Sequence, residues 1–407
     1  MNFTNVNSEN AMNTLRLWNP DVAWSVISGV LASAGITRLA DVTRLDVVGI
    51  PTWQAVRPAA IVLSVSQGKG RSHLDAKISA AMEAIEHASW ERFQPVPRWS
   101  NIAAFQCESV VNPLELADFI HGSISPRAEL PWCSTRDLVS GREIWVPHDI
   151  TCVQRGGTYH KGPKHAFATT NGLASGSSIV EATLHALLEV IERDAHACAD
   201  YFMEHEGLPR PQMDVESFEQ PGVLDLVKMV RAANLEVLVF SNDNEAEISC
   251  YSVYLVDKAV MGLTNVGHGA HLDPNIAVTR AIIEAAQGRI TMISGTREDN
   301  SRADYRFLHE VGAVLAERAM FESSLSSRPL PAPNKATEIK SSLDEALEYI
   351  VARLQQLGHQ SVLQIDMTSP QVGIPVAKVL VPGLSGYHRP ILKRLSSYRA
   401  WRSRKDI

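Results

Sequence analysis

The stretch SIVEATLHALLEVIERDA (178–195) predicts a long helix that is mostly buried and nevertheless carries several carboxylates. Alanine, leucine, valine and isoleucine surround Glu181, Glu189 and Glu192, and a helix that is apolar around most of its circumference belongs in a protein core. Burying a carboxylate costs on the order of several kcal/mol unless the group is paired or binds a cation. The sequence therefore predicts a source of positive charge beside this helix.

Two further stretches repeat this combination of an apolar helix and spaced polar groups. They are SHLDAKISAAMEAIEHASWERF (72–93), with Ser79, Glu83 and Glu86, and PNIAVTRAIIEAAQGRI (274–290), with Glu284, Gln287 and Arg289. One such helix is ordinarily explained as an amphipathic element with a solvated polar edge. Three of them favour a magnesium site, because Mg²⁺ prefers oxygen ligands and is commonly shared between carboxylates and nucleotide phosphates.

Lys69 lies between two glycines directly before the first of these helices. The apolar run AAIVLSV (59–65) ahead of it predicts a buried strand. Glycines let a backbone approach an anion closely, and a lysine between them suits a phosphate. The full Walker pattern is absent, so on its own the segment is explained as a surface turn. Beside the carboxylate helices it supports a phosphate site, as do Arg193 and Arg289.

The rest of the sequence mixes helical and strand patterns, which indicates an α/β or α+β fold. Asp273 is a good N-cap and Pro274 a good first residue for the third carboxylate helix. A hairpin is predicted at 138–146, with its turn at Ser140-Gly141. The remaining predicted elements are helices at 22–34, 222–233 and 342–357, strands at 235–240, 251–256, 361–365 and 376–381, and a proline-rich loop at 325–337.

The composition is that of an ordinary globular protein, with 45% hydrophobic and 20% charged residues among 407. A net charge of −7 gives no general reason to expect binding to nucleic acid or to an anionic membrane. No run reaches the roughly eighteen apolar residues of a membrane span, and the first twenty residues lack the apolar stretch of a signal peptide. The five cysteines are scattered and form no CxxC, which suits reduced thiols. We therefore expect a cytoplasmic protein without nucleic-acid or membrane partners.

The three helices resemble the ATP-site motifs of YcaO-domain proteins. The first motif, Ser-x3-Glu-x2-Glu-Arg, is present except that His87 stands where the family usually has arginine. The second, Ser-x2-Glu-Ala-x6-Glu-x3-Arg, and the third, Glu-x2-Gln-x-Arg, are complete. The matching residues are Ser79, Glu83 and Glu86, then Ser178, Glu181, Ala182, Glu189 and Arg193, and finally Glu284, Gln287 and Arg289. Flanking segments such as SQGKG, TTNGLASG and GHGAHLDP also resemble the family, so the resemblance covers nearly the whole chain.

This resemblance implies a YcaO-type fold with mixed sheets, in which the three helices line a site for ATP and Mg²⁺. It implies a catalytic domain at 31–390, a partly disordered segment at 1–30, a basic tail at 391–407 and a homodimer. Magnesium would be held by Glu83, Glu86, Glu189 and Glu192. The nucleotide would be bound by Lys69, Ser79, Asn171, Ser178, Glu181, Arg193, Glu284, Gln287 and Arg289. The exchange of the motif arginine for His87 leaves one ATP contact open, and no separate catalytic residue is assigned.

YcaO enzymes use ATP to phosphorylate a peptide backbone amide oxygen, after which a nucleophile adds to the carbon and phosphate leaves. A side-chain thiol or hydroxyl gives an azoline, an amine gives an amidine, and sulfide gives a thioamide. Azoline-forming members commonly end in a proline-rich tail, whereas LSSYRAWRSRKDI (395–407) contains no proline. The compact sequence resembles the thioamide-forming members that work with a TfuA partner. We therefore expect thioamidation of a peptide or protein, with azoline-forming cyclodehydration of a ribosomally synthesised peptide as the alternative.

Three other interpretations remain open. In a zinc hydrolase, His185 could act with Glu189, and His196 with Glu192, since each pair is four residues apart, although HExxH is absent. A non-catalytic scaffold could present a substrate to a partner. Cys198 could serve as a nucleophile near His196, although nothing in the sequence orients a triad.

Overall fold

The structure, a computed structural model, describes residues 15–386 with short gaps, and everything below concerns these residues. The gaps are 102–104, 106–109, 117–124, 126, 154–165, 167, 219, 243, 258–263, 301–304, 306–309, 327 and 334–341. The tail expected at 391–407 lies outside the described residues. Residues 1–14 of the expected N-terminal segment also lie outside the described residues. The rest of that segment contains helix α1 (Pro20–Ser28). That helix is shorter than the predicted 22–34.

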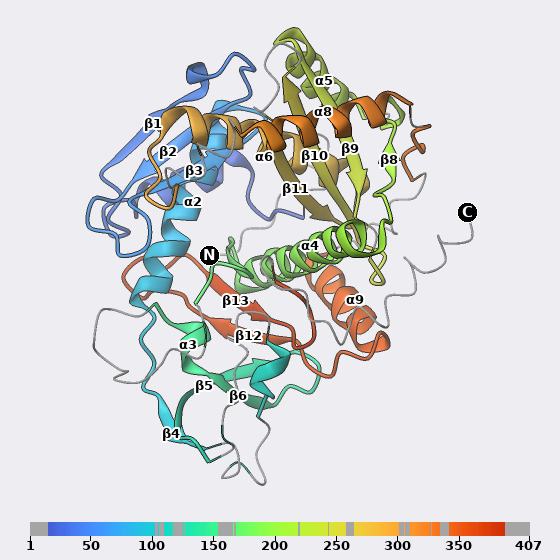
Figure 1. Cartoon of the computed structure of the whole chain (residues 1–407). Coiled ribbons are helices and arrows are strands. Elements are labelled where there is room, and N and C mark those ends of the chain that lie inside the picture. Colours follow the sequence, from blue (N-terminus) through green and yellow to red (C-terminus); the bar gives the residue numbers. More distant parts are fainter. Residues whose placement is uncertain are drawn as a thin grey trace.

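The first layer is a three-stranded antiparallel sheet of order β1-β2-β3, covered by helix α2 (Figure 1). Its elements are β1 (Arg38–Asp41), β2 (Thr52–Val56), β3 (Val65–Lys69) and α2 (His73–Arg92), with a short 3-10 helix η1 (Thr43–Leu45) between β1 and β2. A glycine in the strand lets α2 lie directly on it, because a Cβ on Gly68 would fall 1.9 Å from the backbone nitrogen of Ala80.

The strand predicted at 59–65 is wrong, because β3 begins only at Val65 and runs through SQGK. Residues 59–64 form a tight turn instead, in which Arg57 N–H donates to the Ser64 carbonyl at 2.7 Å. The main-chain N–H groups of Ile61 and Val62 donate to the Glu91 carboxylate, each at 3.0 Å. A buried anion therefore organises this apolar run as a loop.

The second layer is a four-stranded antiparallel sheet of order β11-β10-β9-β8, with α5 and α6 packed on it. Its elements are β8 (Gln212–Met213), η4 (Val215–Ser217), α5 (Pro221–Ala232), β9 (Leu235–Ser241), β10 (Ser249–Asp257), β11 (Asn265–His271) and α6 (Pro274–Ser294). The predicted cap is confirmed, because Asp273 Oδ1 accepts from Asn275 N–H at 2.8 Å and Pro274 is the first helical residue. As in the first layer, a Cβ on Gly267 would collide with α6, 2.2 Å from Ala285 N.

The third layer is a six-stranded sheet in which β4-β5-β12-β13-β7 form one path and β6 pairs with β5. Its elements are β4 (Arg98–Ser100), η3 (Pro113–Glu115), β5 (Leu130–Asp137), β6 (Glu143–Pro147), α3 (His148–Thr151), β7 (Leu173–Ser175), α9 (Leu343–Gln356), β12 (Leu363–Asp366) and β13 (Val376–Leu380). The predicted hairpin is confirmed as β5–β6, with Gly141 at φ 72° in its turn. The mixed α/β architecture is therefore as expected.

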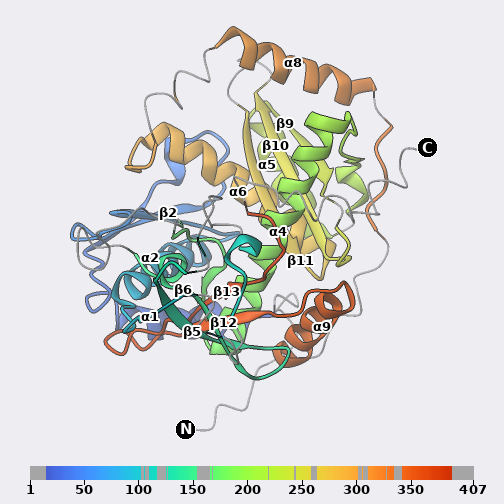
Figure 2. The ribbon, with the colours of Figure 1, turned by 60° about the horizontal axis from the view of Figure 1, so that its bottom comes forward.

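Helix α4 (Ile179–Glu206) lies between the second and third layers and touches both (Figure 1). It packs on β7 and β13 on one side and on β10 and β11 on the other. Helix α8 (Val311–Ser326) lies at the periphery, outside the sheet of β8–β11 (Figure 2). None of the helices described is long and apolar enough to span a membrane. The arrangement brings α2, α4 and α6 together where the three layers meet.

Candidate functional site

The three carboxylate helices converge and bring five glutamates into one cluster. Glu83 and Glu86 come from α2, Glu189 and Glu192 from α4, and Glu284 from α6. Each of these side chains lies close enough to at least one other to change its ionisation. The convergence of these residues, expected from their pattern on the three helices and from the family resemblance, is thus present in the fold.

Burial makes this cluster reluctant to carry its full negative charge. It raises the pKa of Glu86 to about 8, although Ser175 opposes the shift through hydrogen bonds from its Oγ (2.7 Å) and N–H (2.8 Å). It also raises the pKa of Glu189 to about 7, with Arg193 acting against the shift and Glu192 adding to it. A nearby positive charge would favour the ionised form of these acids, and a bound divalent cation supplies such a charge.

Two cations of the protein lie within the cluster. Lys69 at the end of β3 forms an ion pair with Glu284. Arg193 lies 3.9 Å from Glu189 and 3.8 Å from Glu192. Burial alone would raise the pKa of Glu284, but Lys69 and then Arg193 outweigh it and lower that pKa to about 2. Glu284 is therefore ionised at neutral pH, with its charge balanced by Lys69.

Several predicted nucleotide-binding residues have local structural partners. Ser178 is the N-cap of α4, where its Oγ accepts from Glu181 N–H at 3.1 Å. Glu181 in turn accepts from Arg16 at 2.9 Å. Gln287 donates from Nε2 to the Gln67 carbonyl of β3 at 2.8 Å. Ser79 lies on α2, one turn before the acidic residues. These contacts shape the walls of the cluster.

Two predicted residues lie differently from their expected roles. Arg289 was expected to contact phosphate, but its guanidinium forms a buried, two-bond ion pair with Asp46, at 2.9 and 3.1 Å. It therefore ties α6 to the segment after η1. Asn171 lines a small internal cavity with apolar neighbours that include Ile150 and Val379, and its Oδ1 has no hydrogen-bond partner. Its role in nucleotide binding stays a prediction.

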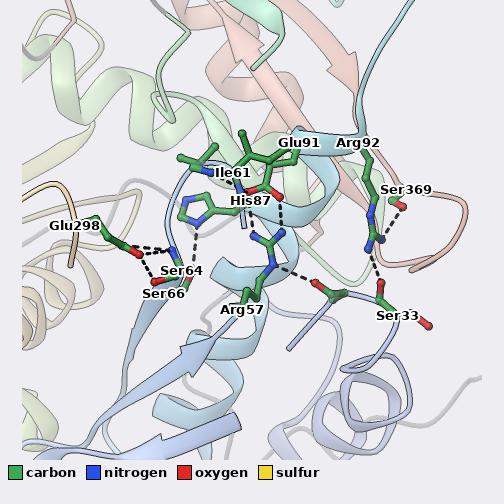
Figure 3. Close-up of polar contacts among 12 residues, drawn as sticks. Ser33, Arg57, Ile61, Ser64, Ser66, His87, Glu91, Arg92, Glu298 and Ser369 are labelled. Atoms are coloured by element: carbon green, nitrogen blue, oxygen red, sulfur yellow. Dashed lines mark hydrogen bonds and ion pairs between the residues drawn. The ribbon is translucent and has the colours of Figure 1, made fainter. Parts of the chain in front are cut away.

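His87, the departure from the first motif, is buried against β3. Its Nδ1 lies 3.1 Å from Ser66 Oγ, and Figure 3 shows the two side chains facing each other. Burial, helped by the charge of Arg57, lowers the pKa of His87 to about 4. The ring is therefore neutral near pH 7. It supplies no positive charge where the motif has arginine.

The sequence interpretation missed two groups that act on the site. Lys378 of β13 is fully buried, and its Nζ donates to the carbonyls of Thr169 (2.7 Å) and Asn171 (2.9 Å) while its charge reaches Glu189. The sequence feature that could have indicated this lysine is its position within the apolar strand VAKVLV. Ser175, which holds Glu86, had no signal beyond its place in TTNGLASG.

The rival metal and thiol sites find little support in the geometry. Within the described ranges, no three His, Cys, Asp or Glu side chains are placed to hold a metal ion by themselves, as a zinc hydrolase requires. His196 is instead bonded to Asp200 (3.2 Å) and Arg210 (3.2 Å). Cys198 is fully buried beside Asp194. Mg²⁺ needs only one or two carboxylates, because phosphate and water oxygens complete its shell, so the facing glutamates fit it.

Comparison with known proteins agrees with this geometry. Residues 67–385 match the family model described as YcaO cyclodehydratase, ATP- and Mg²⁺-binding. The chain belongs to the YcaO family. It is accordingly an ATP-dependent enzyme whose cofactors are ATP and Mg²⁺.

Relatives and solved structures of YcaO proteins align over most of the chain. Uncharacterized protein Rv1375 of Mycobacterium tuberculosis is 36% identical over 91% of the chain and 82% of its own length. An uncharacterized protein in the tfuA 3′ region of Rhizobium leguminosarum bv. trifolii is 30% identical, over 91% and 88%. YcaO from Methanopyrus kandleri, bound with AMPPCP and Mg²⁺, superposes with a TM-score of 0.70 at 21% identity, covering 91% and 93%. A heterocyclase in complex with substrate and cofactor gives a TM-score of 0.77 at 22% identity, and the chain, covered over 91%, spans 53% of that longer chain.

Proposed function

We propose that this YcaO enzyme activates a backbone amide of a peptide or protein and transfers sulfide to it, giving a thioamide, together with a TfuA-like partner. The observation that carries the ATP-dependent step is the cluster of glutamates from α2, α4 and α6, within which burial raises the pKa values of Glu86 and Glu189. One relative is described as a protein in the tfuA 3′ region, and this description favours thioamide formation. ATP supplies the phosphoryl group that makes the amide carbon electrophilic and its oxygen a good leaving group.

The residues of the cluster divide this work by their charge and position. Glu83, Glu86, Glu189 and Glu192 would hold Mg²⁺ against the triphosphate. Lys69 and Arg193, the two cations within the cluster, would bind phosphate oxygens as the nucleotide competes for them with Glu284, Glu189 and Glu192. Ser79 and Gln287 line the nucleotide site beside them. Ser178, Glu181 and Arg289 support that site by capping and anchoring its helices.

Cyclodehydration to an azoline is the second candidate. The similarity in fold to a heterocyclase with substrate and cofactor, at a TM-score of 0.77, favours it as directly as the gene name favours thioamidation. Both reactions share the activated amide, and they differ in the nucleophile. The products of the two reactions therefore differ in mass, whereas both reactions consume ATP.

One co-expression experiment separates them. The chain is produced with a TfuA-like protein and candidate substrates, and the substrates are then analysed by mass spectrometry. A gain of about 16 Da marks sulfur for oxygen and supports thioamidation, whereas a loss of about 18 Da marks dehydration. Glu189→Gln/Glu192→Gln should abolish either change. Glu322→Gln, which removes an exposed carboxylate of α8, is the matched control and should leave it intact. Modification that survives in the double variant would overturn the metal assignment.

The proposal extends to assembly. We expect a homodimer that engages the TfuA-like partner, and light scattering of the purified chain, alone and with that partner, gives both stoichiometries directly.

A further inference from the structure

The loop that follows α6 is fastened to the first sheet at two points. Helix α6 ends at Ser294 and is followed by Gly295, which is left-handed at φ 57°. One residue on, Thr296 Oγ1 accepts from Gln54 Nε2 of β2 at 2.8 Å. Glu298 then accepts from Ser64 through both its Oγ and its main-chain N–H, as Figure 3 shows. Residues 295–299 are thus held next to the start of β3.

Arg297 lies between these two anchors and is one-quarter exposed. Its guanidinium donates to Asp299 at 2.9 and 2.5 Å. Its charge reaches two residues of α2, Glu83 and His87, and after burial it is the largest influence on Glu83. No motif of the family includes this arginine. It nevertheless stands at the edge of the carboxylate cluster.

The neighbouring position of the first motif carries no arginine in this chain. The ring of His87 stands there instead, with its Nδ1 3.1 Å from the Oγ of Ser66, two residues after the anchor residue Ser64. Arg57, whose charge acts on His87, is committed to Glu91 through two hydrogen bonds of 3.3 and 2.5 Å inside the core (Figure 3). The side of the cluster nearest to β3 therefore depends on Arg297 and Lys69 for positive charge.

We propose that Arg297 is a nucleotide-binding residue of this enzyme, which supplies from the 295–299 loop the phosphate-facing guanidinium that the first motif lacks because position 87 is histidine. The proposal rests on ATP binding at the carboxylate cluster. A phosphate oxygen beside Glu83 and its Mg²⁺ would take over the hydrogen bonds that Arg297 now gives to Asp299. The two anchors would keep the guanidinium at that place.

Nucleotide titrations of four proteins test the assignment. Binding of a fluorescent ATP analogue with Mg²⁺ is followed by anisotropy for the wild type, Arg297→Gln, Arg297→Lys and the control Arg318→Gln. Arg318, like Arg297, pairs with a nearby acid, but it lies on the exposed face of α8. We expect Arg297→Gln to weaken binding at least about tenfold, in line with loss of a charge-assisted hydrogen bond. Arg297→Lys should keep part of the affinity, and Arg318→Gln should keep all of it.

Two further measurements make the result specific. The loss in Arg297→Gln should be largest for the triphosphate and smallest for the monophosphate analogue, because the residue is assigned to phosphate. Thermal unfolding should show the variant as stable as wild type within a few degrees. Equal affinity of Arg297→Gln and wild type for the triphosphate overturns the assignment. A wild type that fails to bind the triphosphate overturns the proposed function itself, and the role of Arg297 with it.

Discussion

Lys69 and Glu284 form an ion pair that joins the end of β3 to the middle of α6, 215 residues apart in sequence. Glu284 Oε1 also accepts from the main-chain N–H of His268 in β11, at 3.2 Å. Through this carboxylate, the first and second layers of the fold meet at the candidate ATP site. A nucleotide that recruits Lys69 must therefore compete with an acid that already holds it.

Replacement of Lys69 should weaken nucleotide binding more than it weakens the fold. Lys69→Met leaves Glu284 without its main cation in a cluster of acids, so we expect MgATP affinity to fall at least about tenfold. Lys69→Arg should retain much of it, since the charge remains. Isothermal titration calorimetry gives both values. Affinity unchanged in Lys69→Met would remove this lysine from the nucleotide site.

The stability of the apoprotein should decrease as the pH rises above neutrality. The pKa values of Glu86 and Glu189 rise from 4.5 to about 8 and about 7 on burial. A group that binds its proton more tightly when folded stabilises the fold at low pH and loses that effect as the pH rises through the folded pKa. The unfolding temperature in EDTA should therefore fall as the pH rises toward about 8 and level off above that pH. Below about pH 6.5 the buried histidines oppose this fall, because their lowered pKa values make the unfolded chain bind more protons than the folded one, so the fall should be clearest between about pH 6.5 and 8.

Two changes should flatten this pH profile. Glu86→Gln and Glu189→Gln remove the titrating groups, and Mg²⁺ with a non-hydrolysable ATP analogue supplies the missing charge. Calorimetric unfolding across the same pH range measures both effects. A wild-type unfolding temperature that is flat or rises with pH would contradict the assignment of raised pKa values to these acids.

The Arg57–Glu91 pair should matter for stability far more than a surface pair. Both side chains are buried, and Glu91 also holds the turn at 61–62. Glu91→Ala leaves Arg57 buried without its anion, so a loss of about 3–5 kcal/mol is expected. Glu216→Ala breaks the exposed pair with Arg231 and should cost at most about 1 kcal/mol. Urea unfolding of the two variants provides the comparison, and similar losses would show that the buried pair has no special weight.

A methyl group on β3 should disrupt the layer beneath α2. Gly68→Ala places a Cβ 1.9 Å from Ala80 N, which the helix can accommodate only by moving away from the strand. We expect loss of soluble protein or a large drop in unfolding temperature. Gly312→Ala, at a position of α8 with nothing within 4 Å of the added Cβ, should be neutral or stabilising. Normal expression and stability of Gly68→Ala would show that α2 lies farther from β3 than described.

The sequence was most informative where long helices with distinct caps occur. The starts of α2 and α6 follow from Ser72 and from Asp273-Pro274, and the spacing of the polar motif residues within each helix indicated which face would share a site. It failed at 59–65, because the carboxylate that turns this apolar run into a loop belongs to Glu91, nearly thirty residues away. Local hydrophobicity carries no information about such a partner.

The same limit applies to the site. The motif positions predicted that the acids of α2, α4 and α6 lie together. They could not reveal that Arg289 forms an ion pair with Asp46 or that Asn171 lines a small cavity with apolar neighbours. Lys378 and Arg297 reach the cluster from β13 and from a loop, elements outside every motif. Their contributions depend on sheet order and loop anchoring, which become visible only in three dimensions.

The glycines of β3 and β11 have a mechanical consequence for the enzyme. Because α2 and α6 rest with their backbones on the backbones of these strands, no side chain can act as an adjustable spacer between helix and sheet. The distance between α2 and β3, and that between α6 and β11, are therefore set at these glycines by direct backbone contact. Adaptation to different substrates or nucleophiles must come from rotamer changes and from the loops around this rigid frame, and it leaves the frame unchanged.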